Sequence, residues 1–121
     1  DKTSSTDMQV YFPKYVPEGY TISNVETDIL KVTFELVNGN NYILIVQRPL
    51  NGYNAKIALD SENTILEEVT INEHTAFYKN KNKIDYLYFF DNNNYYKISG
   101  DDLSKKEIIR IAESFEMIVG L

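Results

Sequence analysis

The sequence predicts an α+β fold, in which an antiparallel β-meander of about six or seven strands carries one C-terminal amphipathic helix on one face. Two observations lead to this prediction. Short apolar or alternating segments recur along the chain, separated by Asn, Asp, Gly and Pro residues that favour turns. Near the C-terminus the pattern changes to apolar residues at three- and four-residue steps, which is the period of a helix.

At 121 residues the chain has room for one hydrophobic core but little room for a second. We expect residues 1–9 to form a flexible polar lead-in and residues 10–121 to form a single α+β domain. The polar residues from Asp1 to Asp7 are typical of a linker that follows a removed signal or membrane anchor, although a cloning junction would leave the same start.

The first half of the domain is predicted to be a strap followed by strands. Two prolines and several aromatic residues in 10–20 favour an extended strap lying on the domain, with a turn at 17–19. Residues 42–48 are apolar on both faces, which predicts a central strand. Residues 50–64 are expected to form a loop with one helical turn near 53–59. The expected strands are 22–28, 29–37, 42–48, 65–71, 75–79, 84–90 and 95–99.

Three polar segments predict the hairpin turns of this meander. Asn38-Gly39 is a strong signal for a two-residue hairpin loop, with a four-residue loop that includes Asn40-Asn41 as the alternative. Asn72-Glu73-His74 predicts a second tight turn. The run from Asp91 to Asn94 predicts a third, because Asx side chains bond to their own backbone.

The C-terminal segment predicts the helix and its packing face. Ser104 and Glu107 have the spacing of a capping box, so the helix should begin just after Ser104 and continue to Val119. Its apolar stripe should pack across the aromatic hairpin and bury the main core. The stripe consists of Ile108, Ile111, Ala112, Phe115 and Val119.

Composition excludes several classes of protein. A formal net charge of −6 and a pI near 4.7 argue against a nucleic-acid surface, which needs clustered basic residues. No apolar run approaches the length of about 18 residues that a membrane span needs. The chain has no cysteine, and His74 is its single histidine, so thiolate sites, disulfides, His-dependent triads and multi-His metal sites are all impossible within it.

The acidic residues do not form a recognisable site, and we predict no catalytic, cofactor-binding or metal-binding residue. Glu67 and Glu68 should point to opposite faces of a strand, and Asp101-Asp102 precede a helix, where negative charge is favoured. Asp91 to Asn94 lacks the spacing of a calcium loop. An acid–base hydrolase would need two carboxylates facing each other in a pocket, and no motif indicates one.

Tyrosine is the one unusual feature, with ten in the chain. Tyr86 and Tyr88 should share a sheet face in the strand 84–90, and Tyr95 and Tyr96 lie in the next strand. Aromatic rings with hydroxyl tips suit the recognition of peptides or sugars. The interpretation that the sequence favours is that these rings fill the core between sheet and helix, with their hydroxyls at its edge. If the helix covers only one face of the sheet, the other face is open, and Tyr86, Tyr88, Tyr95 and Tyr96 are the candidate interaction surface.

The order of the segments resembles a known family over residues 12–118. The motifs are Val16-Pro17-Glu18-Gly19-Tyr20, Ile71-Asn72, the strand 95–100, and the segment 103–107 leading to 111–114. The chain resembles an uncharacterised domain-of-unknown-function family found in extracytoplasmic parts of Gram-positive bacterial lipoproteins and anti-sigma-factor-like membrane proteins. This resemblance implies an exported, non-enzymatic module.

The expected function is that of a non-catalytic extracytoplasmic interaction or sensor domain in a membrane-tethered or lipid-anchored protein. A protein or peptide is the expected partner, nucleic acid is not, and the membrane would be near only through an N-terminal anchor. The alternative is a small-ligand module that binds lipid or cell-wall saccharide on an aromatic sheet face.

Overall fold

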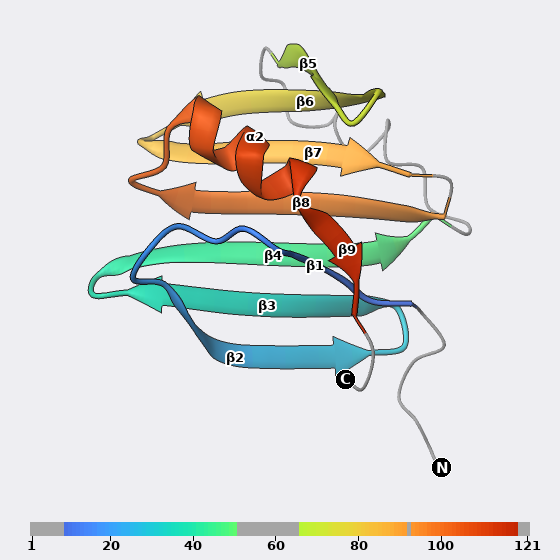
Figure 1. Ribbon diagram of the computed structural model, residues 1–121, viewed down its shortest axis with the longest axis horizontal. Coiled ribbons are helices and arrows are strands. Elements are labelled where there is room, and N and C mark those ends of the chain that lie inside the picture. Colours follow the sequence, from blue (N-terminus) through green and yellow to red (C-terminus); the bar gives the residue numbers. More distant parts are fainter. Residues whose placement is uncertain (1–8, 51–65, 92, 119–121) are drawn as a thin grey trace.

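One large antiparallel sheet forms the body of the domain in the computed structural model, which describes residues 9–50, 66–91 and 93–118 (Figure 1). The sheet has seven strands in the order β2-β3-β4-β8-β7-β6-β5, and a small sheet pairs β1 with β9. The elements are β1 (Tyr11–Pro13), β2 (Thr21–Asp28), β3 (Lys31–Asn38), β4 (Asn41–Pro49), β5 (Glu67–Ile71), β6 (His74–Lys81), β7 (Ile84–Phe90), β8 (Asn94–Asp101), α2 (Lys105–Glu113) and β9 (Phe115–Met117).

The predicted α+β class is confirmed, and the sheet is made of two meanders placed side by side. Strands β2 to β4 form one meander and β5 to β8 form the other. They join where β4 pairs with β8, in a register that runs from Ile43 opposite Gly100 to Pro49 opposite Asn94. The predicted central position of residues 42–48 is confirmed by this arrangement.

Local turn chemistry fixes the hairpins. Asn72 and Glu73 have φ angles of 48° and 72°, as the two central residues of a tight hairpin turn require. Asn38 pairs with Asn41, so Gly39, at φ 62°, and Asn40 form a two-residue loop. The predicted turns at these places are confirmed. The loop after β3 has two residues, but they are Gly39 and Asn40, one position later than the predicted pair Asn38-Gly39.

The main core lies between the sheet and α2. Strand alternation sends Phe34, Ile45, Ile98 and Leu87, which lie opposite one another on β3, β4, β8 and β7, to this side. The Ser104 hydroxyl accepts the Glu107 N–H at 3.1 Å and caps the helix, as predicted. Ile108, Ile111 and Ala112 of the predicted stripe are buried here.

The predicted helix is too long at its C-terminal end. It ends at Glu113, and the next residues become β9, which pairs with β1. Phe115 sets this change, because its ring packs edge-on against Phe89 and Tyr96 at centroid distances of 5.2 Å and 5.4 Å. The strap supplies backbone partners for β9, which an isolated helical pattern does not reveal. Val119 lies outside the described residues.

The N-terminal strap is confirmed as an ordered segment on the α2 side of the sheet (Figure 1). Gln47 of β4 holds it in place: its Oε1 accepts the Tyr11 N–H at 3.0 Å, and its Nε2 donates to the Gln9 carbonyl at 2.6 Å. The strap turns back at Gly19, whose φ is 92°. The expected lead-in, except Gln9, and the expected helical turn at 53–59 lie outside the described residues.

Candidate functional site

The face of the sheet away from α2 has its own set of side chains. Two rows cross it, because residues that lie opposite one another in a sheet share a face. No described helix covers this face, and we call it the far face. One row is Glu35, Leu44, Ser99, Tyr86 and Lys79, and the next is Thr33, Val46, Lys97, Tyr88, Phe77 and Glu68.

Three of the predicted tyrosines stack on the far face. Tyr86 and Tyr88 are nearly parallel, with ring centroids 6.3 Å apart, and Tyr88 and Tyr95 repeat this arrangement at 6.5 Å. Tyr88 and Tyr95 are only 2% and 6% exposed, whereas Tyr86 is partly exposed. Apolar side chains pack around the two buried rings, and these are Leu50, Leu66, Phe77, Tyr86 and Phe90.

Two lysines add positive charge to the stack. The Lys79 ammonium lies 4.7 Å from the centroid of the Tyr86 ring, and the Lys97 ammonium lies 5.5 Å from the same centroid. At this distance an ammonium is attracted by the negative face of the ring. Lys79 is buried and Lys97 is partly exposed. Tyr86 and Lys97 thus form the part of the stack that faces solvent.

Tyr96, the fourth predicted residue, lies on the other side of the sheet in the main core. Its hydroxyl donates to Asp91 Oδ2 at 2.7 Å, and the other oxygen of Asp91 accepts the backbone N–H groups of Asn93 and Asn94. Burial, and then the hydrogen bond to Asp91, raise the pKa of Tyr96 above its ordinary value. This tyrosine packs the core and holds the β7–β8 turn.

A partly exposed apolar strip lies beside the tyrosine stack on the same face. Leu44 and Val46 point outward from β4, and Val37 and Tyr42 continue the strip toward the turn between β3 and β4. Leu44 is two strands from Tyr86, with only the small Ser99 between them. The sequence shows that residues 42–48 are apolar on both faces. It does not show that β8 lies beside this strand, so the sequence analysis did not predict an apolar strip next to the tyrosine stack.

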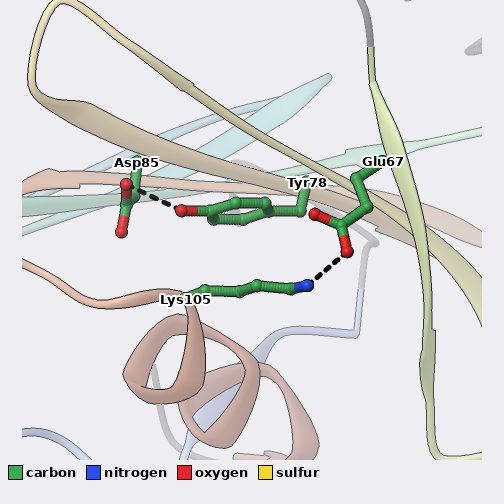
Figure 2. Close-up of polar contacts among 4 residues, drawn as sticks. All are labelled: Glu67, Tyr78, Asp85 and Lys105. Carbon is green, nitrogen blue, oxygen red and sulfur yellow. Dashed lines mark hydrogen bonds and ion pairs between the residues drawn. The ribbon is translucent and has the colours of Figure 1, made fainter.

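A polar cluster joins the start of α2 to the edge of the sheet (Figure 2). Lys105 forms an ion pair with Glu67 of β5, and its ammonium also lies 5.7 Å from the centroid of the Tyr78 ring. The Tyr78 hydroxyl donates to Oδ1 of the buried Asp85 at 3.1 Å. Burial first, and then the hydrogen bond and charge of Asp85, raise the pKa of Tyr78 to about 12. Tyr78 therefore keeps its proton at neutral pH and acts as a hydrogen-bond donor.

The other polar residues concern the metal-binding and acid–base sites that the sequence analysis considered. Among the described residues, no group of three or more His, Cys, Asp or Glu side chains is placed to hold a metal ion. His74 is exposed at the start of β6, and Glu67 and Glu68 lie on opposite faces as expected. Within residues 9–50, 66–91 and 93–118, no helix is long and apolar enough to span a bilayer.

The fold and this surface define a class of small α+β domain in which one sheet face is packed by a helix and a strap and the other carries aromatic and aliphatic side chains. The chain belongs to the family described as domain of unknown function DUF4367, whose model matches residues 10–115. This match confirms the resemblance to an uncharacterised domain family. No curated protein and no solved structure is significantly similar to the chain.

Proposed function

We propose that this DUF4367 chain is a non-catalytic interaction or sensor domain that binds a protein or peptide partner through the far face of its sheet. The observation that carries the proposal is the partly exposed strip of Leu44 and Val46 beside Tyr86 and Lys97. An apolar centre with an aromatic residue and a charged rim is the usual composition of a protein-binding surface.

The packing around Tyr86 suits this role. Its ring is stacked on Tyr88, which is itself stacked on Tyr95. The partly exposed Tyr86 ring is therefore packed against buried rings that hold it in place. A side chain that is already fixed loses little conformational entropy when a partner binds. Lys97 stands at the edge of the strip, where it can attract a carboxylate of the partner.

We also propose that the domain works outside the cytoplasm in a membrane-tethered or lipid-anchored protein. The resemblance of its sequence motifs to extracytoplasmic domains supports this location. A test is to fuse alkaline phosphatase, which is active only after export, to the C-terminus of the full-length protein in its host. Active phosphatase is expected, and an inactive but abundant fusion would contradict the location.

Site-specific photo-cross-linking tests the binding surface in the same host. A benzophenone amino acid replaces Leu44 on the far face or, as the control, Glu113, which is exposed at the end of α2. The proposal predicts one discrete protein adduct from position 44 that is lost when Tyr86→Ser is added, and none from position 113. Equal adducts from both positions, or adducts insensitive to Tyr86→Ser, would refute the far face as the binding surface.

A second candidate is a small-ligand module for lipid or cell-wall saccharide on the same face. The partly exposed Tyr86 ring with the Lys97 ammonium near it favours this alternative, because sugars stack on aromatic rings. The two candidates differ in the cross-linking experiment. A small-ligand module gives no protein adduct from position 44, and the purified domain binds cell-wall saccharide or lipid vesicles in a manner that Tyr86→Ser abolishes.

A further inference from the structure

The exposed large apolar side chains of the domain gather at one edge of the sheet. Ile22 and Val25 on β2 are 50% and 38% exposed, and Ile29 and Leu30 in the following turn are 71% and 60% exposed. Among the described residues the one other exposed large apolar side chain is Met117. Scattered exposed apolar residues need no explanation, but four within nine consecutive positions do.

Strand β2 is also an edge strand, and no other strand of the described residues pairs with its outer side. It is eight residues long, ends the strand order of the sheet, and contains neither Lys nor Pro, the residues that commonly block an edge. Its bulge lies between Ile22 and Asn24, and the pairing with β3 is regular from there to Asp28. The opposite edge, β5, has five residues, and an ion pair links its Glu67 to Lys105 of α2.

The register shows which backbone groups of β2 point away from the sheet. Asp28 and Lys31 close the two-residue turn at the end of the hairpin, so their backbone groups face each other. Hydrogen-bonded and non-hydrogen-bonded pairs alternate along antiparallel strands. Val25, opposite Phe34 and three residues before Asp28, therefore turns its N–H and C=O outward.

The two sides of this edge differ in chemistry. Val25 lies opposite Phe34 on the core side of the sheet, and Ile22 lies opposite Leu36 on the same side. Glu26 and Asp28 lie on the far side, opposite Thr33 and Lys31. A strand added beside β2 would thus meet aliphatic side chains on one face and carboxylates on the other.

We propose that β2 binds an extended segment of a partner protein in which apolar residues alternate with basic residues. The segment adds an eighth strand to the sheet, its backbone bonding to Val25 and its apolar side chains covering Ile22 and Val25. Its basic side chains lie beside Glu26 and Asp28. This site is at the edge of the sheet and does not depend on the proposed binding surface of the far face.

Charge favours such a partner over a second copy of the chain. In an antiparallel β2–β2 pair centred on Glu26, the two Glu26 carboxylates would face each other, and centring on Thr27 would place Glu26 opposite Asp28. Centring on Val25 would bring the bulge at Ser23 into the new ladder. A basic strand meets none of these obstacles.

The test uses short synthetic peptides and backbone NMR of the whole chain. A peptide of alternating Lys and Val is expected to shift the amide signals of Ile22 to Asp28 and to slow hydrogen exchange at Val25. A peptide of alternating Glu and Val should bind far more weakly. Glu26→Lys should reverse this preference, whereas Glu68→Lys on the opposite edge strand is the matched control and should leave it unchanged.

A proline substitution separates strand addition from simple charge attraction. Val25→Pro removes an outward N–H without removing a β2–β3 hydrogen bond, so the fold should be kept. Its binding should weaken about fivefold, which is the value of one net hydrogen bond. The proposal is overturned if the Lys-Val peptide shifts no β2 amide, if Val25→Pro binds as well as the parent chain, or if sedimentation shows β2-dependent dimers that exclude the peptide.

Discussion

At the scale of single residues, the buried carboxylate of Asp85 is stabilised by hydrogen bonds from only a few neutral donors. Asp85 is 2% exposed, and its Oδ1 accepts hydrogen bonds from the Tyr78 hydroxyl and the Asn80 amide. Its other oxygen has no hydrogen-bond partner within the described part of the chain. A buried charge with few partners makes each remaining hydrogen bond costly to lose.

Tyr78→Phe should therefore lower the free energy of unfolding by about 1–2 kcal/mol, because it removes one donor from a buried carboxylate. Urea denaturation followed by tyrosine fluorescence measures this loss. Tyr42→Phe is the control, since the Tyr42 hydroxyl has no hydrogen bond to any described residue, and it should change stability by less than about 0.5 kcal/mol. Equal losses in the two variants would show that the Tyr78–Asp85 bond contributes nothing.

The raised pKa of Tyr78 also leads us to expect a loss of folding stability at alkaline pH. Its pKa is raised from 10.0 to about 12 in the folded chain, so the folded state holds this proton more tightly than the unfolded state does. The contribution of Tyr78 is complete below pH 10 and is lost as the pH rises from 10 through about 12. The raised pKa of Tyr96 acts in the same direction.

Denaturation midpoints measured at closely spaced pH values check this prediction. The parent chain should lose stability above pH 10, and Tyr78→Phe should lose less over the same interval. A parallel decline in the two proteins would mean that another group controls the alkaline transition.

The sequence correctly predicted which side chains share a sheet face wherever the alternation within a single strand decides this. It placed Tyr86 and Tyr88 on one face, and the register confirms this. It could not place Tyr96 in the main core, because the choice of face for β8 depends on its pairing with β4 and β7. Whether the candidate tyrosines bind a partner stays a prediction that the proposed experiments test.

At the scale of elements, the strap depends on Gln47. This buried side chain forms two hydrogen bonds with the backbone of Gln9 and Tyr11. Gln47→Leu should lower the free energy of unfolding by about 2 kcal/mol, at about 1 kcal/mol for each net hydrogen bond. It should also speed hydrogen exchange at the Tyr11 amide.

The internal control is Ile98, whose amide lies in the centre of the sheet and should keep its exchange rate in this variant. Unchanged exchange at Tyr11 would mean that packing of Val10 and Phe12 against the core is enough to hold the strap.

Elements defined by local chemistry were predictable from the sequence. The turn at Asn72-Glu73 and the cap at Ser104 depend on nearby residues alone, and both were found. The end of α2 was not predictable, because Phe115 to Met117 leave the helix to pair with a strand about a hundred residues earlier. Local helical periodicity cannot report such a partner.

At the scale of the whole molecule, the β4–β8 pair joins two meanders into one sheet. Gly100 lies in this pair, where an added Cβ would be 2.7 Å from the Tyr42 backbone oxygen and 2.9 Å from Leu103 Cδ1. Gly100→Ala should therefore force the two strands apart and cost about 1–3 kcal/mol, as overpacking of a core does.

Urea unfolding should still be a single transition in Gly100→Ala, shifted to a lower midpoint, since both meanders share the core under α2. A second transition would show that the meanders unfold independently. Like the end of α2, this long-range pair was not predicted from the sequence, because nothing local to residues 42–48 identifies 94–101 as their neighbour.

The most direct test of the central claim, that the far face binds the partner, is methyl NMR of the domain titrated with the partner captured by cross-linking. Val37, Leu44 and Val46 report on the far face, and Ile108 and Ile111 report on the core under α2. The account predicts that the methyl signals of the first group shift and broaden when the partner is added, while the methyl signals of the second group do not change. Shifts confined to residues of α2 and the strap, with Leu44 and Val46 unchanged, would contradict it.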